Sequence, residues 1–131
     1  MIVRGVALTF LFTATALAAE PVKISKTWTG HMPVVVPPLL ESSVASRAQW
    51  SNVWATCQMK GAAPAVDFDK YLVLVAVRNS TSVRFADAKL DHGNLTTRVV
   101  ATPDASPRRT CAFAQVPRAG VQRVNGAPPG K

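Results

Sequence analysis

The chain has 131 residues, and its 15 lysines and arginines outnumber its 7 aspartates and glutamates, which gives a formal net charge of +8. This length fits about one domain, which excludes a two-domain enzyme with a separate cofactor fold. Hydrophobic residues make up 48% of the chain, so the composition argues against disorder. A chain of this kind is expected to fold around one modest core.

The N-terminus has the pattern of a secretory signal peptide. Arg4 precedes an uncharged apolar stretch, and residues 16–18 form an A-x-A cleavage site at its end. The alternative is an N-terminal membrane anchor, but a membrane span needs about 20 apolar residues and this stretch is shorter. We therefore predict cleavage after Ala18 or Ala19, a periplasmic or secreted protein, and no membrane span after cleavage.

The remaining sequence divides by composition into three segments. Residues 19–42 combine an alternating strand pattern with a proline-rich loop. Residues 43–125 contain the main helix and most of the strands, so they are predicted to form the main α+β domain. Residues 126–131 are rich in proline and glycine and are predicted to be a flexible tail.

The clearest helix is predicted over residues 46–57. Ser46 can cap its N-terminus, and Gln49 lies three residues further on, where a capping box has its second member. Four apolar residues recur at the spacing of one helical face, namely Trp50, Val53, Trp54 and Cys57. This stripe predicts a core-facing helix, although two tryptophans could also serve as a ligand platform.

The other elements are predicted to be short strands. Residues 71–77 form a continuous, valine-rich apolar run, which is typical of a strand buried on both faces. Beyond residue 80, several alternating segments are joined by connections of hairpin length, which favours antiparallel pairing. We therefore predict an α+β fold with one small antiparallel β-sheet of five to six strands and one main helix packed on it.

Cys57 and Cys111 are the only cysteines in the chain. In an exported protein an isolated pair is expected to form a disulfide. That bond would close a loop of about 55 residues and contribute about 4 kcal/mol through loop-closure entropy. The alternative is a catalytic thiolate at Cys57 with His31 or His92 as its base, but no neighbouring motif supports it. We predict one disulfide, Cys57–Cys111.

Metal and acid–base chemistry find little support in the sequence. His31 and His92 belong to no metal-binding motif, and the turn signal around His92 explains that residue without a metal. Asp67 and Asp69 could act as a glycosidase pair or bind Ca²⁺, but the rest of a calcium loop is absent. We favour a capped turn before the strand at residues 71–77. The sequence thus predicts no catalytic residue, no metal and no cofactor.

Basic residues are frequent in the last third of the chain. The candidate binding patch consists of Arg108, Arg109, Arg118 and Arg123, and Asp104 is the one acid nearby. A positive patch on an exported protein attracts acidic proteins or polyanions. Nucleic acid is not expected, because export removes it and aromatic residues do not alternate with the basic ones. The alternative is a generally basic surface with no specific partner.

Three stretches of this sequence resemble the PrcB-like C-terminal domain, a family of small exported bacterial domains related to a subunit of a surface protease complex. They are the W-x-x-x-W helix at residues 50–54, the P-x-V-D-F-D-K-Y-L-V-L-V-A-V run at residues 64–77, and T-C-A-F-A-Q-V-P-R at residues 110–118. The resemblance covers about residues 43–124. Family members often have a glycine-containing stretch after the apolar strand, but residues 78–83 contain no glycine. The resemblance implies a non-catalytic role with a partner and transfers no catalytic residue.

We therefore expect an exported, non-enzymatic accessory or binding protein whose partner is a protein of the cell envelope. One alternative is a secreted inhibitor of a protease or other hydrolase that presents residues 78–82 or 103–109. In that case Arg108 or Arg109 would enter a trypsin-like specificity pocket, where a buried aspartate favours basic side chains. A second alternative is a small hydrolase that uses Asp67 and Asp69.

Overall fold

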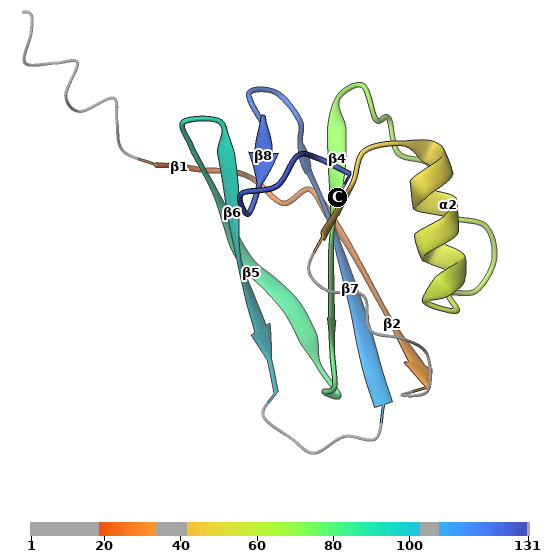
Figure 1. Cartoon of the computed structure of the whole chain (residues 1–131). Coiled ribbons are helices and arrows are strands. Elements are labelled where there is room, and N and C mark those ends of the chain that lie inside the picture. Colours follow the sequence, from red (N-terminus) through yellow and green to blue (C-terminus); the bar gives the residue numbers. More distant parts are fainter. Residues whose placement is uncertain (1–18, 34–41, 103–107, 131) are drawn as a thin grey trace, which may run out of the picture.

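The structure is a computed structural model of the chain and describes residues 19–33, 42–102 and 108–130. The predicted signal peptide and most of the proline-rich loop lie outside these ranges. Within them the chain forms one helix and eight strands (Figure 1). In chain order they are β1 (Glu20–Pro21), β2 (Lys26–Pro33), β3 (Ser42–Val44), α2 (Arg47–Thr56), β4 (Tyr71–Arg78), β5 (Val83–Asp91), β6 (Asn94–Ala101), β7 (Arg108–Pro117) and β8 (Arg123–Val124).

The strands form two sheets, not the single sheet predicted from the sequence. One sheet has the order β1-β5-β6-β8 and the other has the order β2-β7-β4-β3. All neighbouring strands are antiparallel except β6 and β8, which are parallel. The α+β class and the predominance of antiparallel pairing are therefore confirmed. The prediction of one sheet was wrong because β4 and β5, although joined by a short loop, belong to different sheets.

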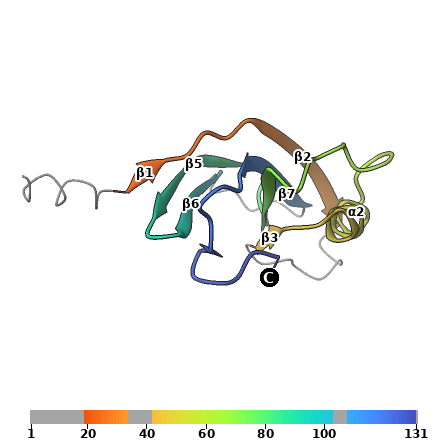
Figure 2. The ribbon, with the colours of Figure 1, turned by 90° about the horizontal axis from the view of Figure 1, so that it is seen from above.

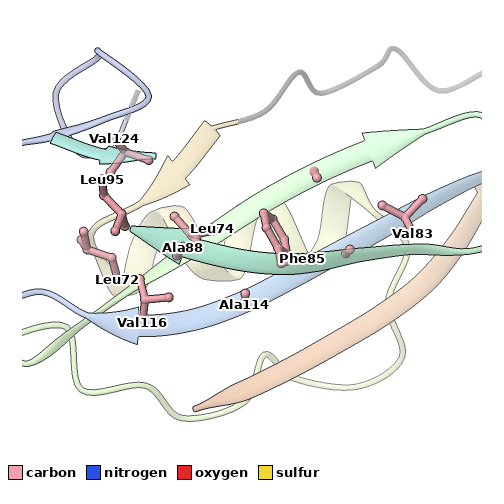
Figure 3. Close-up of a cluster of buried hydrophobic side chains, with 11 residues drawn as sticks. Leu72, Leu74, Val83, Phe85, Ala88, Leu95, Ala114, Val116 and Val124 are labelled. Atoms are coloured by element: carbon pink, nitrogen blue, oxygen red, sulfur yellow. The ribbon is translucent and has the colours of Figure 1, made fainter. Parts of the chain in front are cut away.

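The two central strands, β4 and β7, explain this arrangement. Successive side chains of a strand point to opposite faces, and both strands are apolar on both faces. One face, which includes Val75 and Phe113, packs under α2. The other face, which includes Leu74 and Val116, packs against β5 and β6 (Figure 3). Each apolar face needs its own cover, so α2 and the β5–β6 pair lie on opposite sides of β7 (Figure 2).

The helix agrees closely with its prediction. Ser46 is the N-cap, and its Oγ accepts a hydrogen bond from the Gln49 backbone N–H at 3.2 Å. Gln49 Oε1 in turn accepts from the backbone N–H of Ala45 at 2.9 Å, one residue before the usual capping-box partner. Trp50 and Trp54 are buried and contact the Phe113 ring at centroid distances of 5.2 and 5.8 Å. The predicted stripe is therefore part of the core.

The cysteines lie together, but the predicted disulfide is absent. Cys57 ends the helix and Cys111 lies on β7, and both are fully buried. They approach to 2.9 Å without a bond and remain free thiols. The sequence predicted that the two residues meet only as the partners of a disulfide, and it carries no information on their oxidation state.

Both ends of the described chain are built into the fold. Residues 20–21 pair with β5 and residues 26–33 pair along β7, so the N-terminal segment contributes one strand to each sheet. Residues 126–130, predicted as a flexible tail, fold back onto the start of the helix. The Gly130 N–H donates to Ser43 Oγ at 2.9 Å, and Gln49 Nε2 donates to the Gly130 carbonyl at 2.8 Å. No helix within the described ranges is long and apolar enough to cross a membrane.

Candidate functional site

The candidate basic patch is divided between the two ends of β7. Arg108 and Arg109 begin this ten-residue strand, and Arg118 follows its last residue. A strand of this length spans about 33 Å at about 3.3 Å per residue. Arg123 lies on β8 beside the β5–β6 turn, at the same end as Arg118 (Figure 1). The four arginines therefore do not form one surface.

Arg118 has a structural role. Its Nη1 donates to the Phe68 carbonyl at 2.6 Å and to the Ala45 carbonyl at 3.1 Å, and the residue is half-buried. These bonds join the turn before β4 to the connection between β3 and α2. Arg123 is exposed, and its Nη2 donates to the His92 carbonyl at 3.2 Å. Of the two, only Arg123 is free enough of the core to meet a partner.

A second group of arginines gathers at the opposite end, where β4 turns into β5. We call Arg78 of β4, Arg84 of β5 and Arg109 of β7 the arginine end. Arg109 Nε donates to Asn79 Oδ1 at 3.1 Å, which joins the start of β7 to the β4–β5 loop. Arg84 is exposed. The sequence analysis missed this group because its members lie on three strands that are separated in the sequence. The pairing of Arg78 with Thr110 places the end of β4 beside the start of β7.

The described carboxylates lie away from the arginine end. Asp87, midway along β5, forms a salt bridge with Arg98 at 3.0 Å, which balances its charge. The others lie on β1, in the turn before β4, or at the far end of β5, and they are Glu20, Asp67, Asp69 and Asp91. Within the described residues this end therefore carries three arginines and no carboxylate.

A buried polar network fixes the loop at the arginine end. Ser80 is 1% exposed, and its hydroxyl contacts the carbonyls of Ser82 at 3.0 Å and Thr102 at 2.8 Å. The Thr110 hydroxyl, also 1% exposed, donates to the Ser80 carbonyl at 2.5 Å. The hydroxyl has a single hydrogen, which it donates to Ser80. In its 2.9 Å contact with His31 it is therefore the acceptor, and His31 Nδ1–H is the donor. The loop at residues 79–82 is thus bonded to Thr102 after β6 and to Thr110 of β7.

Replacing Thr110 with valine should lower the free energy of unfolding by about 1–3 kcal/mol, because the Ser80 carbonyl and the His31 N–H both lose a partner within the fold. Urea unfolding followed by circular dichroism would measure this loss. Thr96→Val is the matched control, since Thr96 is exposed on β6 and its long 3.4 Å bond contributes little. Equal effects of the two substitutions would contradict a role for the network.

The predicted turn at Asp67 and Asp69 is confirmed. Asp67 Oδ1 accepts from the Asp69 backbone N–H at 3.1 Å, and the Asp67 carbonyl accepts from the backbone N–H groups of Lys70 and Tyr71. Both aspartates are exposed beside a shallow depression that also includes Arg47. The Asp67 carboxylate therefore stabilises the turn as a hydrogen-bond acceptor, which argues against its use as a catalytic base.

The histidines and thiols also have partners that account for them. His92 Nδ1 lies 2.6 Å from Asp91 Oδ1 in the exposed β5–β6 turn. The hydrogen bond between the two cysteines raises the pKa of Cys111 far above that of a free thiol and lowers the pKa of Cys57, with burial opposing the second shift. Within the described ranges no group of three or more His, Cys, Asp or Glu side chains could hold a metal ion.

No family model, curated protein or solved structure matches this chain. The resemblance to the PrcB-like domain thus rests on residues 50–54, 64–77 and 110–118 alone. In the fold these stretches are the middle of α2, the central strand β4 with the turn before it, and the central strand β7. All three contribute to packing around the core beneath α2.

Proposed function

We propose that this protein is an exported accessory protein that binds an acidic surface of a protein partner in the cell envelope through its arginine end. The observation that supports the proposal is the position of Arg78, Arg84 and Arg109 on three strands at one end of the fold, away from the described carboxylates. Guanidinium groups stay charged at every physiological pH and bind carboxylates in a bidentate geometry. This chemistry suits recognition better than proton transfer.

The rigidity of the loop beneath these side chains supports a binding role. Ser80, Thr110 and His31 hold residues 79–82 through buried or half-buried hydrogen bonds. A surface that is already ordered loses less conformational entropy when a partner binds. The envelope location is part of the proposal and rests on the predicted signal peptide, and the non-catalytic role is what the PrcB-like resemblance implies.

Reversing two charges at the arginine end tests this function. The double variant Arg84→Glu/Arg109→Glu should bind a poly-glutamate of defined length at least about tenfold more weakly, since close charge pairs couple by about 1.5 kcal/mol or more. The matched control is Arg47→Glu/Arg123→Glu, which has the same net charge but alters exposed residues elsewhere. Fluorescence anisotropy at several salt concentrations gives both affinity and salt dependence. An equal loss in the control would mean that only the overall charge matters.

Crosslinking in cells addresses the partner itself. A photoreactive residue at Thr81, exposed in the β4–β5 loop, should capture a defined envelope protein, whereas one at Ser51, exposed on α2, should not. The Arg84→Glu/Arg109→Glu background should abolish that product. A product that is identical at both positions would contradict the proposed surface.

Inhibition of a hydrolase is the second candidate, and the fixed loop at residues 79–82 favours it. Inhibitory loops gain affinity when they are held in their bound conformation before binding, and Arg109 contacts this loop through Asn79. The candidate loop at residues 103–109 lies, up to residue 107, outside the described residues. An inhibitor would block a trypsin-like protease and lose potency in Arg109→Ala, whereas a binding protein would leave the protease active.

Export makes a separate prediction about the N-terminus. The protein recovered from the envelope or medium should begin at Ala19 or Glu20, because signal peptidase requires small residues before the cut. The double substitution Ala18→Leu/Ala19→Leu should therefore retain the uncleaved precursor. Intact mass analysis of both proteins measures the outcome, and a wild-type protein that still begins at Met1 in that fraction would contradict it.

A further inference from the structure

A cavity of about 430 Å³ lies between β2 and the end of α2, on the helix-bearing side of the molecule. Its lining comes from residues 29–31 of β2, from Trp54 of the helix, and from residues 58–60 of the chain that follows. The volume falls within the range of about 300–1,000 Å³ that is usual for small-molecule sites. Two features of its lining indicate what it would bind.

The first feature is a hydrogen-bond donor without an acceptor. Trp54 lines the cavity, its side chain is 7% exposed, and its Nε1 is buried with no hydrogen-bond partner among the described residues. The neighbouring Trp50 differs, since its Nε1 donates to the Pro64 carbonyl at 2.9 Å. Buried polar groups are nearly always paired, and an indole N–H can only donate. A ligand for this cavity should therefore carry an acceptor.

The second feature is the sign of the charge. Lys60 is exposed at the cavity, and among the described residues no carboxylate pairs with its ammonium group. No aspartate or glutamate contributes to the lining, whereas Trp54 and Met59 make much of it apolar. An anionic acceptor on an apolar body satisfies the donor, the cation and the apolar wall together.

Met59 lines the same cavity and lies against β2. The Sδ of Met59 lies against Gly30 of β2, where an added Cβ would come within 2.1 Å of the sulfur. Methionine has three rotatable bonds and adapts readily to different neighbours. Met59 is only partly buried, so its side chain can turn aside and leave apolar space next to Trp54.

We propose that this cavity binds a small apolar carboxylate. A carboxylate oxygen accepts the hydrogen bond from Trp54 Nε1, the Lys60 ammonium group balances the charge, and the apolar part of the ligand takes the place of the Met59 side chain. The proposal does not rest on the proposed partner-binding function, because neither Trp54 nor Lys60 belongs to the arginine end.

Calorimetric titration of the full mature protein with 4-phenylbutyrate, 4-phenylbutanol and 4-phenylbutylamine tests the ligand class. The carboxylate should bind at least about tenfold more tightly than the alcohol, because hydrogen bonds to charged groups are the stronger ones, and the amine should be the weakest. Equal affinities of the carboxylate and the alcohol would overturn the proposal, as would the absence of binding by the carboxylate.

Two substitutions test the residues. Trp54→Phe keeps an aromatic ring without the N–H, and Lys60→Gln removes the charge, so each should weaken 4-phenylbutyrate binding by about tenfold or more. Trp28→Phe and Lys70→Gln are matched controls outside the cavity lining and should bind as the wild type does. Lys60 is exposed, so its variant folds even if Trp54→Phe is destabilised. Unchanged affinity in Lys60→Gln would then overturn the proposal by itself.

Discussion

Replacing Trp50 with alanine is expected to lower the free energy of unfolding by about 3–5 kcal/mol, the usual cost of removing a buried aromatic side chain. Trp50 is 1% exposed and lies at the centre of an aromatic group. Its ring is 5.5 Å from that of Trp28, 5.2 Å from that of Trp54 and 5.2 Å from that of Phe113. The substitution leaves a cavity between α2 and the sheet.

Trp50→Ala also removes a hydrogen bond that ties the helix to the segment between α2 and β4. The Trp50 indole is the donor to the Pro64 carbonyl, so that acceptor loses its partner as well. Trp50→Phe, which loses the bond but keeps most of the volume, should fall between the wild type and Trp50→Ala.

Urea unfolding monitored by circular dichroism measures these differences as shifts of the midpoint. Trp28→Ala is the matched control, because Trp28 belongs to the same aromatic group but is only half-buried on β2. It should therefore cost clearly less than Trp50→Ala. A Trp28 variant as unstable as the Trp50 variant would contradict the placement of Trp50 at the centre of this core.

Oxidising the free thiol pair should raise the free energy of unfolding by up to about 4 kcal/mol, because a cross-link over about 55 residues restricts the unfolded chain. In the structure Cys57 and Cys111 are unbonded and 2.9 Å apart, so little movement is needed to join them. With oxidised glutathione as the oxidant, the two thiols lose two protons and two electrons. One intramolecular disulfide forms, and two molecules of reduced glutathione are released.

The thiolate is the attacking species in this exchange, so oxidation should be faster at higher pH. The hydrogen bond from Cys111 lowers the pKa of Cys57 and raises that of Cys111, which makes Cys57 the first thiol to react. Both residues are 0% exposed, and the reaction therefore has to wait for local opening of the helix end.

The test compares urea unfolding of the reduced and the oxidised protein, with mass analysis to confirm the loss of two hydrogens. The double variant Cys57→Ala/Cys111→Ala is the control and should not respond to the oxidant. Oxidation that lowers stability, or that yields only mixed disulfides with glutathione, would contradict the expected fit of the cross-link.

The elements whose signals lie within a few consecutive residues were predicted well. The helix begins at its Ser46 cap and presents Trp50 and Trp54 to the core, as its 3.6-residue period indicates. The apolar run at residues 71–77 is the doubly buried strand β4, and Asp67 caps the turn before it. Capping and side-chain periodicity depend on neighbours in the chain, so the sequence carries them explicitly.

The candidate site could not be predicted in the same way. Arg108, Arg109, Arg118 and Arg123 are close in sequence, but the extended backbone of β7 carries the first two away from the others. Arg78 and Arg109 are 31 residues apart in the sequence, yet the register of β4 and β7 places the end of β4 beside the start of β7. Strand pairing over such separations depends on which apolar faces bury one another.

The sequence by itself determined the class of the fold, the limits of the helix and the buried central strand. The tertiary structure alone decided that the strands divide into two sheets, since β4 and β7 have two apolar faces and each requires its own cover. It also decided that Arg78, Arg84 and Arg109 lie at one end of the fold, because the burial of apolar side chains fixes where β4, β5 and β7 lie and the charged side chains are carried with their strands.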